Sequence, residues 1–376
     1  MRATLVTNVT KIAEIEDDWR ALASLRGNGF ITPEWFRSWW THQDGSSSSL
    51  ISVVRRDDGS VAGVMPLVLD ESSRPHVIRF GGAGLGDRFH PAAAEAEEEE
   101  VAAATMTALG EAGHQRALVL LEHIPQDHAW WRRMQDTASS KRAAIEQQRT
   151  DMLFVPLAGL DWETFVSQRS SKFRSQIRRR ERVLARDHGL ELHAATAATL
   201  ERDLAEFFRL HELRWKGRGS ALELETTRAI LSDFARAAQC RGWLRLHLLK
   251  AEGSCVAAFF GWRLGDSFAS YQGGFDPAWS NKSVGMVLTS MTIRGAIEEG
   301  AAEFDFLLGT ETYKRSFTSA SRPAENVVLV RSASPARLAI EMEAAARRAG
   351  GWMTSRPALR PLARTLRRLL PTARRS

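Results

Sequence analysis

The chain has 376 residues, of which 44% are apolar, with a formal net charge of +6 and two cysteines. This length favours two domains with hydrophobic cores of their own. Two cysteines exclude a disulfide framework or a zinc cluster, and the scattered histidines argue against a metal site. The apolar runs are too short to span a bilayer, and the first residues lack the features of a signal peptide, so we expect a cytoplasmic protein.

The first half predicts a strand, two helices, three strands, a helix, a strand, a helix and a closing strand. Thr32 is a good helix cap, and the following Pro33 is tolerated in a first turn. The turn at residues 57–59, Asp-Asp-Gly, is typical of a hairpin. The expected elements lie at residues 3–8, 11–25, 33–40, 50–56, 61–70, 76–80, 94–112, 116–124, 127–138 and 152–157.

The second half repeats this order after a basic helix, which predicts a duplicated unit. Its expected elements lie at residues 170–187, 190–196, 199–216, 225–241, 243–250, 255–263, 267–273, 283–299, 303–308 and 326–331, with a short helix between the last two strands. We therefore divide the chain into a first unit at 1–158, a second unit at 159–331 and a basic helical tail at 332–376.

Positive charge is concentrated in residues 172–186 and in the tail. The tail carries arginines without any acidic residue between them: Arg347, Arg348, Arg356, Arg360, Arg364, Arg367, Arg368, Arg374 and Arg375. Such a segment suits nucleic acid, an anionic membrane or an acidic partner, and a solvated extension is an equally good interpretation.

A strand that runs into a helix beginning at Lys282, Ser283 and Gly285 predicts an anion site, because free N–H groups and the helix dipole attract negative charge there. The corresponding helix of the first half begins with Glu97–Glu100 instead. Carboxylates in that position satisfy the dipole themselves and repel a phosphate. We expect only the second unit to bind a phosphate-bearing ligand.

The order of elements resembles the GNAT acyltransferase fold, and a tandem of two such units resembles the Fem peptidyltransferases. Several segments resemble a branch that includes CelD-like proteins of polysaccharide biosynthesis: FITPEWFRSWW, VMPLVL, GLGDRFHP, SKFRSQIRRRERVL, HELRWKGRG, GWLRLHLLK, FDPAWSNKSVG and DFLLGTETYK. The resemblance implies an α/β (α+β) fold of two tandem units, each a mixed, mostly antiparallel twisted sheet flanked by helices.

The resemblance also implies acetyl-CoA, or another acyl-CoA, as co-substrate. The family's pyrophosphate motif is Arg or Gln, two residues, Gly, one residue, then Gly or Ala. The matching residues here are Lys282, Ser283, Val284, Gly285, Met286 and Val287, so a valine replaces the last small residue. Amides of this turn would meet the pyrophosphate, with Lys282 beside it.

Catalytic residues follow from the same resemblance. Tyr313 stands where GNAT enzymes often protonate the leaving thiolate, and Lys314 matches a Fem-like lysine that could stabilise an oxyanion. An amine acceptor must also lose a proton, for which Asp305 and Asp87 are candidates.

Further polar residues are candidates for acceptor binding: His211, Arg214, Trp215 and His90. Arg214 could hold a carboxylate or phosphate. For each of them, a polar group that stabilises the fold is the competing interpretation.

We therefore expect an N-acyltransferase that moves an acyl group, in the first place acetyl, from acyl-CoA to an amine, with an amino sugar or polysaccharide precursor as a candidate acceptor. One alternative is a Fem-like transferase that uses aminoacyl-tRNA, whose binding would weaken with salt. The other is a non-catalytic accessory protein of an exopolysaccharide system.

Overall fold

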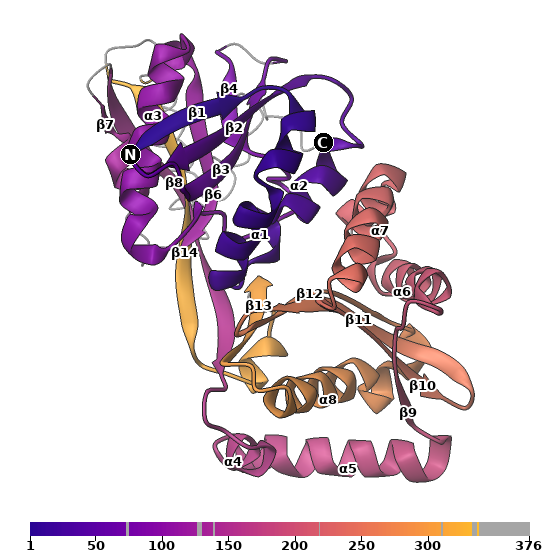
Figure 1. The fold of residues 1–376 in the computed structure, drawn as a ribbon. Coiled ribbons are helices and arrows are strands. Elements are labelled where there is room, and N and C mark those ends of the chain that lie inside the picture. The colour runs from indigo at the N-terminus through magenta and orange to yellow at the C-terminus, as the bar shows by residue number, and fades with distance from the viewer. Residues whose placement is uncertain are drawn as a thin grey trace, which may run out of the picture.

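The computed structural model describes residues 1–72, 75–125, 130–137, 140–217, 219–309, 311–332 and 337. Two α/β halves lie one above the other and are joined by a twisted sheet (Figure 1). The predicted helical tail at 332–376 lies almost wholly outside the described residues. Within them, no helix is long and apolar enough to cross a membrane.

The first half consists of the following elements, where η denotes a 3₁₀-helix: β1 (Arg2–Val6), η1 (Val9–Glu14), α1 (Glu16–Leu25), η2 (Gly29–Ile31), α2 (Pro33–Trp40), β2 (Ser47–Arg55), β3 (Val61–Asp70), β4 (Val77–Phe80), β5 (Ala92–Ala93), η3 (Glu95–Glu97), α3 (Glu98–Glu111), η4 (His114–Arg116), β6 (Leu118–Pro125), η5 (Trp130–Met134), β7 (Asp136–Thr137) and β8 (Ser140–Pro156).

The second half consists of these elements: α4 (Trp162–Ser167), α5 (Ser171–His188), β9 (Glu191–Ala194), α6 (Leu200–Trp215), η6 (Ala221–Glu223), α7 (Glu225–Cys240), β10 (Leu244–Ala251), β11 (Ser254–Leu264), β12 (Ser267–Phe275), η7 (Pro277–Lys282), α8 (Val284–Glu298), β13 (Glu303–Leu308), η8 (Lys314–Ser316) and β14 (Ser321–Arg331).

The sheet has the order β1-β2-β3-β4-β6-β14-β8-β13-β12-β11-β10-β9 and is mostly antiparallel. Its two parallel pairs are β4 with β6 and β12 with β13. In the second half, α6 and α8 cover opposite faces of β10–β12, and α5 lies against the outer side of α8 (Figure 1). These layers confirm the predicted α/β class with a mixed, mostly antiparallel sheet.

Two strands belong to both halves of the sheet. β8 pairs with β13 of the second half at Glu303↔Pro156, and it pairs with β14 along nearly its whole length. β14 is the last described strand in the chain, yet it also pairs with β6 of the first half. The proposed boundary at residue 158 therefore separates elements in sequence that share strands in space.

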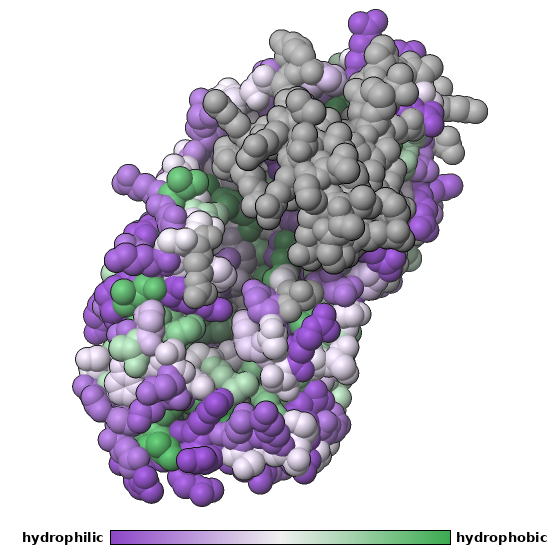
Figure 2. Space-filling model, turned by 180° about the vertical axis from the view of Figure 1, so that it is seen from behind, coloured by the Kyte–Doolittle hydropathy of each residue, from purple (hydrophilic) through white to green (hydrophobic). Residues whose placement is uncertain are grey.

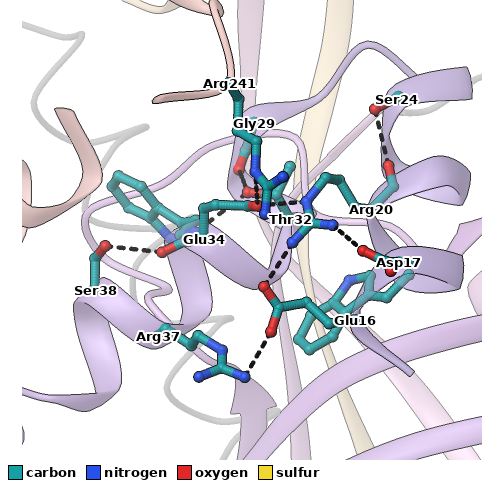
Figure 3. A network of polar contacts seen from close by, with 12 residues as sticks. Glu16, Asp17, Arg20, Ser24, Gly29, Thr32, Glu34, Arg37, Ser38 and Arg241 are labelled. Carbon is teal, nitrogen blue, oxygen red and sulfur yellow. Dashed lines mark hydrogen bonds and ion pairs between the residues drawn. The ribbon is translucent and has the colours of Figure 1, made fainter. Parts of the chain in front are cut away.

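The junction of the halves contains both rings and ion pairs. Phe30 packs edge-on against Trp262 with ring centroids 5.0 Å apart, and Trp35 packs against Phe234 at 5.2 Å. Glu34 on α2, only 6% exposed, accepts from Arg20 at 2.5 Å, and Arg241, just after α7, lies 3.3 Å away (Figure 3). Removing one of these arginines would leave Glu34 with a buried charge that is less well compensated.

Two predictions for the end of the first half are wrong. Residues 127–138 were expected to form a helix, but within the described part Trp130–Met134 is a short 3₁₀-helix and Asp136–Thr137 a strand. The closing strand was expected at 152–157, whereas β8 already begins at Ser140. Its first residues are polar and charged, and the backbone ladder with β14 holds them in the strand in place of an apolar pattern.

Candidate active site

A cavity opens where β12 and β13 diverge. The two strands pair only at Ser267↔Glu303, Phe268↔Phe304 and Ala269↔Asp305. Beyond Ala269 they separate, and β12 has an irregularity opposite β11 between Phe260 and Gly261. The opening holds a cavity of about 340 Å³.

The cavity brings together most of the residues that the sequence predicted for donor binding, catalysis and acceptor binding. Its wall includes Arg214, Trp215, Ser283, Val284, Gly285, Met286, Tyr313 and Lys314. The outer strand of the wall is β12 from Ser270 to Phe275, whose edge no longer pairs with β13. Free backbone groups of a strand edge and the start of a helix thus face one space, an arrangement that suits a ligand with both amide and phosphate groups.

The start of α8 at this cavity is open to an anion. Ser283 precedes the helix with a left-handed backbone (φ 56°), makes no side-chain cap, and no acidic residue lies in the first turn. The first N–H groups of a helix have no intrahelical acceptor. A Cβ added at Gly285 would contact only Phe275, at 3.4 Å, so the approach to this turn is unobstructed.

The corresponding place in the first half is closed by ion pairs. Glu97, just before α3, lies 2.6 Å from Arg56, and Glu98 lies 3.1 Å from Arg26. The space where β4 and β6 diverge is filled, because Phe80 stacks on Phe89 with centroids 5.2 Å apart. That the first unit offers no phosphate site stays a prediction.

Tyr313 lies in the cavity wall beside a cation. The guanidinium of Arg214 is 6.0 Å from the Tyr313 ring and 5.1 Å from the Trp215 ring, and it donates to the carbonyl of Gly273 at 3.1 Å. Burial raises the pKa of Tyr313 above its ordinary value, and Arg214 partly opposes this shift. The phenol is therefore neutral at neutral pH and able to donate a proton.

Lys314 is buried, and its ammonium group points at the end of β13. It donates to the carbonyls of Phe306 at 3.1 Å and Leu308 at 2.8 Å, and lies 2.8 Å from Glu311. These contacts fix the end of the strand at the cavity. The positive charge remains next to the cavity, while the ammonium protons are already engaged.

Asp87 reaches the same place from the first half, on the loop between β4 and β5. Its Oδ2 accepts from the N–H of Leu308 at 3.2 Å, and its Oδ1 lies 3.5 Å from Nδ1 of His123. Burial raises the pKa of Asp87 to about 7, with a further contribution from Asp305. A buried carboxyl that titrates near neutrality beside a cavity is a typical proton acceptor.

Asp305 belongs to a buried ion cluster outside the cavity wall. It pairs with Arg88 and lies 3.3 Å from Arg322, and both arginines also pair with Glu303. Its other oxygen accepts from the N–H of Leu307 at 2.7 Å. The cluster ties the loop of the first half to β13 and β14, a structural role that its contacts satisfy completely.

The remaining predicted residues lie around the cavity at different distances. His211 is buried between Phe207 and Trp215, and burial lowers its pKa to about 4. His90 lies in the first half, where its Nδ1 is 3.3 Å from Glu98. Lys282 lines a different groove, next to α5.

Three residues of the site were missed in the sequence. Tyr271 lines the cavity and donates its hydroxyl to the carbonyl of Leu85 at 2.6 Å, which connects β12 to the loop that carries Asp87. His123 faces Asp87 and has a left-handed backbone (φ 53°). The main-chain N–H of Leu308 holds Asp87. No residue pattern predicts a main-chain donor or a left-handed backbone at a histidine, so these features of the site are seen only in the folded structure.

Comparisons with known proteins agree with this geometry. Residues 171–315 match the family described as acetyltransferase (GNAT) domain. The chain is similar in structure to FemX, with a TM-score of 0.63 and 12% identity over 91% of this chain and 100% of that one. It is also similar to L-PGS from Bacillus licheniformis, with a TM-score of 0.54 and 13% identity over 87% of this chain and 95% of that one. No curated protein matches the sequence.

At these identities the structural likeness concerns the fold, which the chain shares with FemX over nearly its whole length. The family match covers α5 to η8, the segment that builds the cavity. Residues 171–315 therefore match a GNAT acetyltransferase domain, and this match supports an acyltransferase.

Proposed function

We propose that the protein transfers an acyl group, in the first place acetyl, from acyl-CoA to an amine. The observation that carries the proposal is the open start of α8 at the cavity between β12 and β13. The pyrophosphate would bind the N–H groups of Val284, Gly285 and Met286, since these have no intrahelical acceptor. The pantetheine arm would lie along the unpaired edge of β12.

In this proposal the amine enters from the side of the first half and attacks the thioester directly. Asp87 accepts the proton that the amine loses, because it is hydrogen-bonded to Leu308 of the cavity wall and its pKa is about 7. Tyr313 donates a proton to the departing thiolate. Lys314 holds the end of β13 and contributes its charge to the developing oxyanion.

Calorimetric titration with acetyl-CoA tests the donor assignment. Glutamate at position 285 places a carboxylate where the pyrophosphate would bind, so Gly285→Glu should weaken binding roughly 100-fold or abolish it. Gly295→Glu is the matched control, since it makes the same change on the same helix at a position with no atom within 4 Å of a new Cβ. If wild-type protein does not bind acetyl-CoA, or if both variants bind like wild type, the donor assignment is wrong.

The acceptor belongs to the same proposal. We propose an amine-bearing small molecule, with amino sugars and polysaccharide precursors as first candidates because of the branch that the local segments resemble. A mass-spectrometric screen of amines with acetyl-CoA would identify acylated products. Products formed only from amines without a sugar would overturn the amino-sugar assignment.

Transfer from aminoacyl-tRNA is a second candidate function, supported by the likeness to FemX along the whole chain. The basic helix α5, at the start of the matched segment, provides cations that RNA requires. Under this alternative, tRNA binds tightly at low salt and its affinity falls steeply as salt is added. If the protein binds acetyl-CoA but not tRNA, transfer from aminoacyl-tRNA is excluded and acyl transfer from acyl-CoA remains.

A further inference from the structure

A second groove lies directly outside the donor cavity, between α5 and η7. It has a volume of about 360 Å³, and its charged residues are Arg179, Arg180 and Lys282. None of its described lining residues is acidic. A concave surface with several cations and no carboxylate attracts an anion with more than one charge.

The arginines are held in place by the rest of their helix. Gln176, Arg179, Arg180 and Val183 follow the spacing i, i+3, i+4 and i+7, so they share one face of α5. Glu181 on the same helix pairs with Arg294 of α8 at 3.2 Å. The groove is therefore part of a docked helix and not of an independent extension.

The charge of the groove is only partly balanced by its neighbours. Nη1 of Arg180 lies 3.2 Å from the sulfur of Met286, which carries no charge. The nearby carboxylate of Asp187 pairs with Arg186 at 2.5 Å, and Arg186 and Lys282 both contribute to lowering its pKa. Arg179 is exposed, and Arg180 and Lys282 are half-buried, so their charged groups face the groove and the solvent.

The groove and the donor cavity meet at one peptide unit. Lys282 lines the groove, and Ser283, the next residue, lines the cavity. A ligand whose pyrophosphate lies at the start of α8 would lie next to this peptide unit. We propose that Arg179, Arg180 and Lys282 bind the 3′-phosphate on the ribose of the CoA donor.

This inference rests on the proposed acyl-CoA donor and adds the recognition of its nucleotide end. The α8 turn accounts for the pyrophosphate, which leaves the 3′-phosphate as the remaining multiply charged group of the molecule. Arginine side chains bind phosphate oxygens in pairs, and lysine adds a point charge. The basic helix α5 of the second unit thereby becomes part of the donor site.

The test compares acetyl-CoA with acetyl-dephospho-CoA, which lacks the 3′-phosphate, by calorimetry on the full chain. Wild-type protein should bind acetyl-CoA roughly ten-fold or more tightly than the dephospho compound. The double variant Arg179→Ala/Arg180→Ala should lose this preference, with unchanged affinity for acetyl-dephospho-CoA. The control is Arg182→Ala, an exposed cation on the same helix that does not line the groove.

The outcomes separate this proposal from the donor assignment. If wild-type protein binds neither compound, the donor assignment fails. If it binds both equally, or if the double variant loses affinity for both by the same factor, the 3′-phosphate site is wrong while the donor assignment stands. If the wild type does not discriminate and the double variant instead loses binding of unfractionated tRNA, the groove belongs to a polynucleotide.

Discussion

Replacing Asp87 by asparagine tests the proton acceptor without knowledge of the substrate. The variant keeps the shape of the side chain and an oxygen that can accept the hydrogen bond from the N–H of Leu308, and it removes the titrating carboxyl group. Burial raises the pKa of Asp87 from 3.8 to about 7. Between these two values the folded protein binds a proton that the unfolded chain has released, so this residue makes the folded state less stable as pH rises.

The size of the effect follows from the shift. The pKa shift of about 3 units corresponds to about 4 kcal/mol, at about 1.4 kcal/mol per unit. Between pH 4 and pH 7 the unfolding free energy of the wild type should fall by this amount relative to that of the variant. Above pH 7 the difference is constant. Urea unfolding of both proteins across this range measures it, since only the difference between them isolates Asp87.

Catalysis should change in the opposite sense. Acyl transfer by the wild type should rise with pH to a plateau, with an apparent pKa near 7, and Asp87→Asn should lower kcat/KM roughly 100-fold and remove this rise. Asp57→Asn, on the fully exposed β2–β3 turn, is the control for both assays. If Asp87→Asn shows the same pH dependence of stability as the wild type, burial does not raise the pKa of Asp87. If it keeps the pH-dependent rise in rate, another group accepts the proton.

Three further changes test other parts of the structure. Tyr313→Phe should lower kcat roughly 100-fold with little change in acetyl-CoA affinity, and an unchanged kcat would exclude the phenol as proton donor. Gly274→Ala should lower the unfolding free energy by about 2 kcal/mol or more, because the new Cβ would lie 2.3 Å from a backbone nitrogen of α6. Gly295→Ala is the control and should not lower the unfolding free energy, because no atom lies within 4 Å of its new Cβ. Arg322→Leu should cost about 3 kcal/mol, since Asp305 keeps only part of its charge compensation, and equal denaturation midpoints would contradict this.

Much of the second half could be predicted from the sequence because its signals are local. The start of α8 is recognisable from Gly285 and from the lack of acidic residues after Lys282, and Tyr313 lies on the loop that follows an apolar strand. That Lys282 lines a separate groove was not predictable. The left-handed backbone of Ser283, at the turn into α8, was not indicated by any residue pattern either.

The contribution of the first half to the site could not be predicted from the sequence, for a different reason. Asp87 and Leu308 are 221 positions apart, and their hydrogen bond exists only because the loop after β4 reaches across the junction. The length of β8 was missed because its polar residues 140–151 are held by pairing with a strand far along the chain. Contacts over such separations leave no periodicity to detect.

The position of β14 has a consequence for how the molecule forms during synthesis. The ribosome releases this strand after all other described strands, yet its place lies between β6 and β8, both made long before. Until then the edge of β6 has no partner on that side, and such an edge invites pairing with other chains. The sheet of the amino-terminal half is therefore complete only after β14 has been translated. Because β14 is far from β6 and β8 in the sequence, its pairing with them should be a slow step of folding.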